Sequence, residues 1–233
     1  MSKPEPHCDI DDWNPEPVPH FSTYLFDLDG TLIDSIGLIM ASYRHTMQRH
    51  LGAVPAERDW RAGFGTPLRT QLAKFGRDPD EVEAMTATYR AYNNEHHDQM
   101  VTAYPGVHDL LESLHAAGVP LAVVTSKSRA SMERGLRLCA LDHFFREHVT
   151  TDDVTRFKPH PEPVIEALAR LSAEASGTVF VGDSPHDVAA GRAAGVQTAA
   201  ALWGPFDTSA FEESGHKPDF WLHHPAELHR VGS

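Results

Sequence analysis

Short apolar runs that end in polar residues recur along the chain of 233 residues. The first run, Tyr24–Phe26, leads into Asp27-Leu28-Asp29-Gly30-Thr31. Continuous apolar residues followed by a polar, glycine-containing exit are typical of a parallel strand that is buried on both faces. The pattern predicts four further strands, of which the last is an edge strand. They span residues 121–124, 178–181, 197–201 and 220–222.

Helical patterns of apolar residues lie between these predicted strands. Gly118 and Gly195 follow two of the patterns, and glycine commonly stands just after the end of a helix. Strands that alternate with helices predict an α/β fold with a Rossmann-like, doubly wound parallel sheet. Ligands of such folds bind beyond the carboxyl ends of the strands, where the polar exits of this chain lie. The helical patterns span residues 107–117, 128–138, 162–171 and 187–194.

Residues 36–104 interrupt this alternation. They show helical periodicity and no convincing strand, and a loop of that length is not structureless inside a compact domain. We therefore expect a helical insert that forms a cap over the polar strand ends, with hinges near Ser35 and Tyr104. The core is expected to comprise residues 21–35 and 105–233. Residues 1–20 contain five prolines and little apolar content, which predicts a flexible tail.

Composition narrows the set of partners. With 20 basic and 33 acidic side chains the formal charge is −13, which argues against nucleic acid as a partner, because that binding relies on Lys and Arg. No apolar run approaches the roughly 20 residues needed to cross a bilayer, so no membrane association is expected. Cys8 and Cys139 form neither a disulfide framework nor a metal motif. Without an apolar signal segment, we expect a cytoplasmic protein.

Four aspartates follow predicted strands. Asp27 and Asp29 are spaced i and i+2, so they are expected to reach the same side unless the turn rotates the second one. Asp183 and Asp187 come after the strand at 178–181. Carboxylates this close repel one another unless a cation or a shared proton intervenes. Hard carboxylate oxygens at a site that also holds a phosphate suit Mg²⁺, the cofactor that we expect.

Each of these candidate residues also has an ordinary structural explanation. Thr125 and Ser126 precede a predicted helix and could cap it, and Asp183 could cap the next one. Lys158 could be a solvated loop residue. Their order, each at a successive strand end, is much harder to explain by chance.

The same residues carry a resemblance to a known family. Phe26-Asp27-Leu28-Asp29-Gly30-Thr31-Leu32, Thr125, Lys158-Pro159 and the pair Asp183 and Asp187 resemble the four ordered motifs of the haloacid dehalogenase superfamily. The helical insert resembles the small cap of its phosphatase branch. The resemblance covers roughly residues 21–226.

The resemblance implies a role for each catalytic residue. Asp27 would attack phosphorus and become an aspartyl-phosphate. Asp29 would protonate the leaving oxygen and then activate the hydrolytic water. Thr125, Ser126 and Lys158 would neutralise the phosphoryl oxygens.

It also implies a metal site. Mg²⁺ would be held by the Asp27 carboxylate, the backbone carbonyl of Asp29 and the Asp183 carboxylate. Asp187 would hold these ligands in position without binding the ion itself.

The residues that carry the resemblance also favour some branches of the superfamily over others. The second acid, Asp29, disfavours the dehalogenases. Residues 36–43 lack the histidine that β-phosphoglucomutase-like members carry, which disfavours a mutase. Residues 89–98 and 151–164 look like the bacterial inorganic pyrophosphatases, so we expect pyrophosphate as the substrate. Phosphoglycolate or another small phosphorylated metabolite is the alternative, and a non-catalytic phosphate-binding protein is a further one.

The insert contributes four cap candidates. His96 and His97 either end a solvated helix or place a donor over the leaving group. Thr66 and Arg69 belong to a turn between cap helices, which either is a plain linker or reaches the active site.

Overall fold

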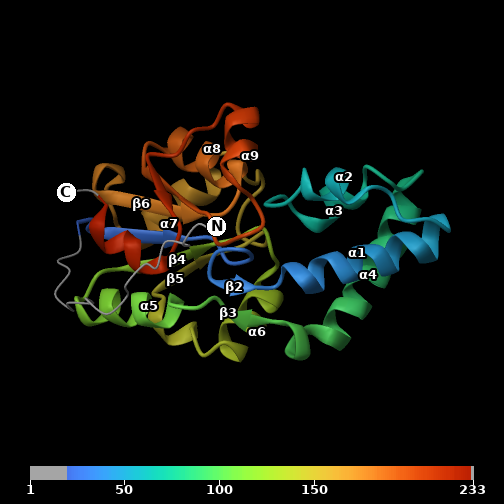
Figure 1. Cartoon of the computed structure of the whole chain (residues 1–233), viewed down its shortest axis with the longest axis horizontal. Coiled ribbons are helices and arrows are strands. Elements are labelled where there is room, and N and C mark those ends of the chain that lie inside the picture. The colour runs from blue at the N-terminus through green and yellow to red at the C-terminus, as the bar shows by residue number, and fades with distance from the viewer. Residues whose placement is uncertain (1–19, 232–233) are drawn as a thin grey trace, which may run out of the picture.

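The computed structural model describes residues 20–231. Residues 1–19 and 232–233 lie outside this description, and with them nearly all of the tail predicted over residues 1–20. The described chain folds into an α/β core and a helical cap, which lie side by side in Figure 1. No helix within residues 20–231 is long and apolar enough to cross a membrane.

The core is built on a six-stranded sheet in which every pairing is parallel, in the order β5-β4-β1-β6-β7-β8. This confirms the Rossmann-like α/β fold. The first strand along the chain lies inside the sheet, between β4 and β6. The strands are β1 (Thr23–Phe26), β4 (Leu121–Val124), β5 (Glu147–Val149), β6 (Thr178–Gly182), β7 (Gln197–Ala201) and β8 (Phe220–Leu222).

Helices cover both faces of the sheet (Figure 1). Alternate residues of β1 face opposite ways, so Tyr24 and Phe26 pack into one buried cluster and Leu25 into another. The first cluster includes α5 and α6, and the second includes α7 and α8. The core helices are α5 (Val107–Ala116), α6 (Arg129–Leu138), α7 (Glu162–Leu171), α8 (Pro185–Ala194) and α9 (Thr208–Ser214), with 3-10 turns η2 (Asp142–Phe144), η3 (Ala175–Gly177) and η4 (Pro225–Arg230).

The cap is inserted between two short strands, β2 (Ile33–Asp34) and β3 (Thr102–Ala103), which pair antiparallel. Residues 102–103 are therefore a strand, although the helical prediction ran to residue 104. The cap has its own apolar core, in which the rings of Tyr43 and Trp60 stack 4.4 Å apart. Its helices are α1 (Ile36–Leu51), α2 (Glu57–Arg61), α3 (Leu68–Leu72) and α4 (Pro79–Met100).

A network of hydrogen bonds holds the loop that follows β5. Asp153 Oδ2 accepts from the backbone N–H of Thr150 at 2.9 Å and from its hydroxyl at 2.6 Å. Arg129 and Arg170 bind the same carboxylate at 2.7 and 3.0 Å. Burial works against the charged form, but these bonds outweigh it and hold the pKa of Asp153 well below its usual value. The network ties α6 and α7 to the segment that leads to Lys158.

Removing the Asp153 charge should destabilise the fold. Asp153→Asn is expected to lower the free energy of unfolding at pH 7 by roughly 1–3 kcal/mol, because it leaves two guanidinium groups without their carboxylate. A carboxyl whose pKa is lowered by folding stabilises above its unfolded pKa and loses that effect as the pH falls. The difference from wild type should therefore shrink below about pH 4. Urea denaturation at pH 7 and pH 3.5 measures both effects.

Glu112→Gln, on the exposed face of α5, removes one acidic charge without touching this network and serves as the control. An Asp153→Asn variant as stable as that control at pH 7 would contradict the prediction.

Candidate active site

The carboxyl ends of β1, β4 and β6 meet at one edge of the sheet, and each carries a predicted site residue. Asp27 directly follows β1, and its backbone N–H donates to Val181 of β6 at 2.9 Å. Thr125 directly follows β4, and Asp183 directly follows β6. Because β1 lies between β4 and β6, three segments far apart in sequence converge here. All three side chains are buried.

Lys158 enters this group from the loop before α7. Its side chain is buried, and its Nζ donates to Asp27 Oδ1 at 2.8 Å and to Asp187 Oδ1 at 2.6 Å. A third bond goes to the carbonyl of Val124 at 3.2 Å. Burial disfavours the ammonium, but Asp187 and Asp27 outweigh that effect and raise the pKa of Lys158. Lys158 is therefore a fixed positive charge beside Asp27.

Three carboxylates surround this single lysine. Oxygens of Asp27, Asp183 and Asp187 lie within 4.8 Å of one another, and all three residues are buried. Burial, with a contribution from Asp187, raises the pKa of Asp27 to about 7 against the opposing effect of Lys158. Burial, Asp187 and Asp27 raise the pKa of Asp183 well above its usual value. Three hard oxygen donors with one cation leave a net negative charge, which fits a divalent cation such as Mg²⁺.

Glycine is required where the first turn approaches Asp183. Gly30 has φ +83°, and a Cβ there would lie 2.5 Å from Asp183 Oδ2. Thr31, the next residue, donates its hydroxyl to Asp183 Oδ1 at 3.1 Å. The Asp-Gly-Thr sequence therefore does more than form a turn, because it brings the β1 exit against the β6 exit.

Helix α8 is capped by a residue other than Asp183. Ser184 is the N-cap, and its side chain and that of Asp187 form a reciprocal capping box. Asp187 Oδ2 accepts from the Ser184 N–H at 3.0 Å, while its Oδ1 faces Lys158. Asp187 thus joins the start of α8 to the site, and Asp183 remains available for a ligand.

Asp29 faces a different set of partners from Asp27. Its Oδ1 lies 2.6 Å from Lys127 Nζ and accepts a hydrogen bond from the Ser35 hydroxyl. Its carboxylate is not among the three that approach one another in the described structure. The turn therefore rotates the Asp29 carboxylate away from Asp27 and toward the cap hinge. The i and i+2 spacing of the two aspartates allowed for this exception.

Lys127 and Ser35 had no chemical role in the sequence analysis. Lys127 is the third residue after β4, inside the polar exit that contains Thr125 and Ser126, and this position was the available signal. Ser35 was treated only as a hinge. Contacts across 6 and 98 positions of sequence bring both to Asp29, and neither contact follows from local pattern.

Comparisons with known proteins show which family the chain belongs to. The sequence profile described as haloacid dehalogenase-like hydrolase matches residues 24–201. The chain belongs to the haloacid dehalogenase-like hydrolase family. Proteins named "Pyrophosphatase PpaX" are similar to it. The one from Anoxybacillus flavithermus is 41% identical over 90% of this chain and 95% of its own length, and that from Halalkalibacterium halodurans is 43% identical over 76% and 82%.

Solved structures of this family have the same fold. One described as a predicted phosphoglycolate phosphatase from Haemophilus somnus superimposes with a TM-score of 0.81 and 25% identity, over 92% of this chain and 99% of that one. A haloacid dehalogenase-like hydrolase from Bacteroides fragilis gives a TM-score of 0.80 at 24% identity, over 91% and 98%. The resemblance read from the four motifs is therefore confirmed, and the chain is a phosphatase of this family.

The cap loop at residues 63–66 contacts the core. Ser126 Oγ donates to the carbonyl of Gly65 at 2.6 Å. Gly65 has φ +86°, and a Cβ there would lie 2.7 Å from Ser184 Oγ. The ring of Phe64 packs edge-on against Phe206, which follows β7 in the core. The cap loop thus touches the residues beside Thr125 and Asp183.

The other cap candidates have contacts of their own. Thr66 Oγ1 donates to the Gly63 carbonyl, within the turn, and Arg69 pairs with Glu83 on the cap surface. His96 stacks on a neighbouring tyrosine. His97 is buried where the cap meets the core and bonds to a neighbouring aspartate. Within residues 20–231, none of these four side chains forms a hydrogen bond with Asp27, Asp29 or Asp183.

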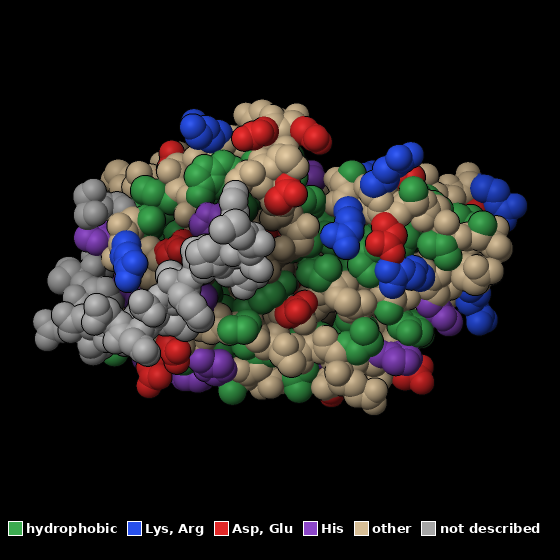
Figure 2. Space-filling model, in the orientation of Figure 1, with side chains coloured by type: hydrophobic (Ala, Val, Ile, Leu, Met, Phe, Trp, Pro, Cys, Tyr) green, Lys and Arg blue, Asp and Glu red, His purple; other side chains and the backbone are tan. Residues whose placement is uncertain are grey.

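Several arginines of the cap are paired with acidic side chains. Figure 2 shows basic and acidic side chains next to one another on the cap. Arg44 pairs with Glu57, Arg69 with Glu83 at 2.7 Å, and the next pair along the chain is Arg77 and Glu81. These pairs direct the charges of Arg44, Arg69 and Arg77 toward neighbouring carboxylates of the cap.

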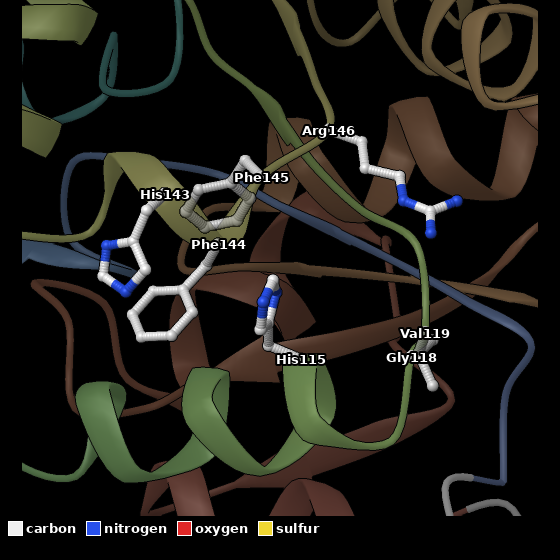
Figure 3. A pocket seen from close by; sticks show the side chains of 7 residues that line it. All are labelled: His115, Gly118, Val119, His143, Phe144, Phe145 and Arg146. Atoms are coloured by element: carbon white, nitrogen blue, oxygen red, sulfur yellow. The ribbon is translucent and has the colours of Figure 1, made fainter.

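A small cavity lies at the opposite edge of the sheet. It has a volume of about 90 Å³ and is bounded by side chains of α5, η2 and the segments that lead into β4 and β5 (Figure 3). These are the amino ends of the strands, whereas Asp27, Thr125 and Asp183 stand at the carboxyl ends. The cavity therefore contains none of the predicted site residues.

The close approach of Gly65 predicts a sensitive position. Gly65→Ala should lower phosphatase activity toward p-nitrophenyl phosphate by about tenfold or more, because the added methyl group meets Ser184 and displaces the cap loop. Gly52→Ala is the matched control. Gly52 is also a cap glycine with positive φ, but a Cβ there has nothing within 4 Å. Equal activity losses in the two variants would mean that backbone strain alone, and not contact with the core, matters.

The carboxylate cluster predicts stabilisation by metal. Saturating Mg²⁺ should raise Tm on the order of 5 °C by binding only the folded state. Burial raises the pKa of Asp27 to about 7 and the pKa of Asp183 well above its usual value, so protonation of these carboxyls stabilises the metal-free fold at low pH. That contribution is lost as the pH rises through the raised pKa of each carboxyl. The Mg²⁺-dependent increase in Tm should therefore be larger at pH 8 than at pH 5.5.

The variant Asp183→Asn tests the location of that metal. It should lose most of the Mg²⁺-dependent increase in Tm, whereas Asp109→Asn on the exposed start of α5 should keep it. Thermal unfolding with and without Mg²⁺ supplies the measurement. An unchanged increase in the Asp183→Asn variant would place the ion elsewhere.

Proposed function

We propose that this phosphatase hydrolyses inorganic pyrophosphate, with Mg²⁺ as cofactor and Asp27 as the covalent nucleophile. The observation that carries the chemistry is the buried pairing of Asp27 with Lys158, next to Asp183 and Asp187. The substrate is supported by the similarity to proteins named "Pyrophosphatase PpaX", which extends over nine-tenths of the chain.

The proposed reaction has two steps on Asp27. A carboxylate oxygen attacks phosphorus, so an oxygen–phosphorus bond forms while the bond to the leaving phosphate breaks. Asp29 donates a proton to the leaving oxygen, then takes one from the water that hydrolyses the aspartyl-phosphate. Asp27 is 4% exposed and Asp29 is partly open. This difference suits a nucleophile shielded from water and an acid that must exchange protons.

Charge stabilisation comes from residues around the phosphoryl group. Lys158, Thr125 and the amides that follow Thr125 neutralise its oxygens, which is the main requirement of phosphoryl transfer. Bound Mg²⁺ supplies further neutralisation of negative charge. The residues that would hold it are Asp27, Asp183 and the backbone carbonyl of Asp29, with Asp187 keeping Lys158 in place.

The cap of residues 36–104 serves as the cover of this site. Its loop at residues 63–66 contacts Ser126 and lies against Ser184, so a displaced cap would open the site to solvent. Exclusion of water protects the aspartyl-phosphate and strengthens the electrostatic interactions around it.

Phosphoglycolate is the second candidate substrate. It is favoured by the structural similarity to the Haemophilus somnus protein described as a predicted phosphoglycolate phosphatase. Both substrates are small and their leaving groups carry negative charge, so the core residues serve either one.

The deciding experiment compares phosphate release from pyrophosphate, phosphoglycolate and several sugar phosphates, with and without Mg²⁺. We expect the highest kcat/KM for pyrophosphate and no turnover without the metal. Asp27→Asn should lower kcat by about 10⁴-fold or more while keeping the fold, because an amide is not a nucleophile. Asp109→Asn provides the matched control.

Two outcomes would contradict separate parts of this proposal. A higher kcat/KM for phosphoglycolate would reject the substrate and leave the mechanism standing. Mg²⁺-dependent turnover that persists in Asp27→Asn would reject the covalent mechanism.

A further inference from the structure

We propose that Lys127 determines specificity for a negatively charged leaving group, and that it binds the phosphate that departs from pyrophosphate. This inference rests on the proposed function, because it assigns the leaving-group side of the same site. Lys127 is separate from the cations that neutralise the transferred phosphoryl group.

The position of Lys127 follows from its bond to Asp29. Its Nζ lies 2.6 Å from Asp29 Oδ1, and both side chains are 18% exposed. Asp29 is the proposed proton donor to the leaving oxygen, so a group bonded to Asp29 stands beside the leaving group. Lys158, in contrast, is bonded to Asp27 and is buried among carboxylates. The two lysines thus serve different ends of the substrate.

The backbone of Lys127 is held firmly. Its N–H donates to Thr125 Oγ1 at 3.2 Å, and its carbonyl accepts from the N–H of Thr151 at 3.0 Å. The flexible part is the side chain, whose ammonium has three N–H donors. It can keep one bond to Asp29 and turn another toward an anion.

Two arginines near this edge of the sheet are paired with aspartates. Arg129 pairs with Asp153, and Arg134 pairs with Asp98. Lys158 is shared by two aspartates. Among residues 20–231, Lys127 is therefore the partly exposed cation that directly contacts a proposed catalytic carboxylate. Pyrophosphate needs such a cation, because its leaving group is itself a phosphate that departs with negative charge.

A purely structural role makes a different prediction. If Lys127 only oriented Asp29, its loss would slow every substrate whose leaving oxygen needs a proton. That loss would be at least as large for alkyl phosphates, since an alkoxide is a poorer leaving group than phosphate. If Lys127 binds the leaving group, its removal lowers kcat/KM more for a negatively charged leaving group than for a neutral one.

The test measures kcat/KM of Lys127→Gln at saturating Mg²⁺ for pyrophosphate, phosphoglycolate and ethyl phosphate. Phosphoglycolate and ethyl phosphate both release a short primary alcohol, and a carboxylate on that alcohol is the difference in charge. We expect a loss of about 100-fold for pyrophosphate and phosphoglycolate, and less than about fivefold for ethyl phosphate. Lys127→Arg, which keeps the charge, should stay within about tenfold of wild type on all three.

Lys217→Gln, which removes an exposed lysine beyond α9, is the control for net charge. Thermal unfolding checks that every variant folds, and the Lys127→Arg variant keeps the test valid if Lys127→Gln does not. An equal or larger loss for ethyl phosphate would overturn the inference, as would a Lys127→Arg variant that loses its preference for charged leaving groups. If wild-type enzyme does not hydrolyse pyrophosphate, Lys127→Gln can still lose far more kcat/KM for phosphoglycolate than for ethyl phosphate. That result would reject the proposed function and support the role of Lys127.

Discussion

The site depends on one buried ammonium, that of Lys158. Three carboxylates lie close together beside it, and burial raises the pKa of two of them, Asp27 and Asp183. The lysine binds Asp27, which follows β1, and Asp187 in α8, and so it joins two segments that meet at the carboxyl ends of the strands. One positive charge does not balance three carboxylates, which favours a further cation at the site. The same imbalance makes the site suited to Mg²⁺ and a phosphoryl group together.

The cap contacts the site through its loop at residues 63–66. It pairs several of its arginines with surface carboxylates and contributes a glycine loop that contacts Ser126 and lies against Ser184. The cations that contact Asp27 and Asp29 come from the core, and they are Lys158 and Lys127. For a chain with a net charge of −13, these two lysines, together with a bound Mg²⁺, would supply the local positive charge that a small anion needs where the surrounding carboxylates would repel it.

Most of the core could be predicted because its strands are buried on both faces and read as continuous apolar runs. Strand β5 and helix α9 were missed. The Glu147-His148-Val149 sequence of β5 has two polar residues that are half-exposed at the sheet edge, so it lacks an apolar pattern. The helix of residues 208–214 has a single buried residue, Phe211, and gives no periodic signal. The pairing of Ile33–Asp34 with Thr102–Ala103 was also missed, because two-residue strands across a long insert leave no local pattern.

The sequence alone is enough to predict the α/β core, the helical insert and the chain order of Asp27, Thr125, Lys158 and Asp183, with Asp27, Thr125 and Asp183 directly after strands. These follow from local patterns of burial and from short motifs with fixed spacing. The tertiary structure alone decided which charges face one another. It separated Asp29 from Asp27 by turning it toward Lys127 and Ser35, and it placed His97 in a buried position at the base of the cap. The physical reason is that electrostatic partners are chosen by distance in space, and distances across an insert of more than sixty residues are not encoded in local sequence.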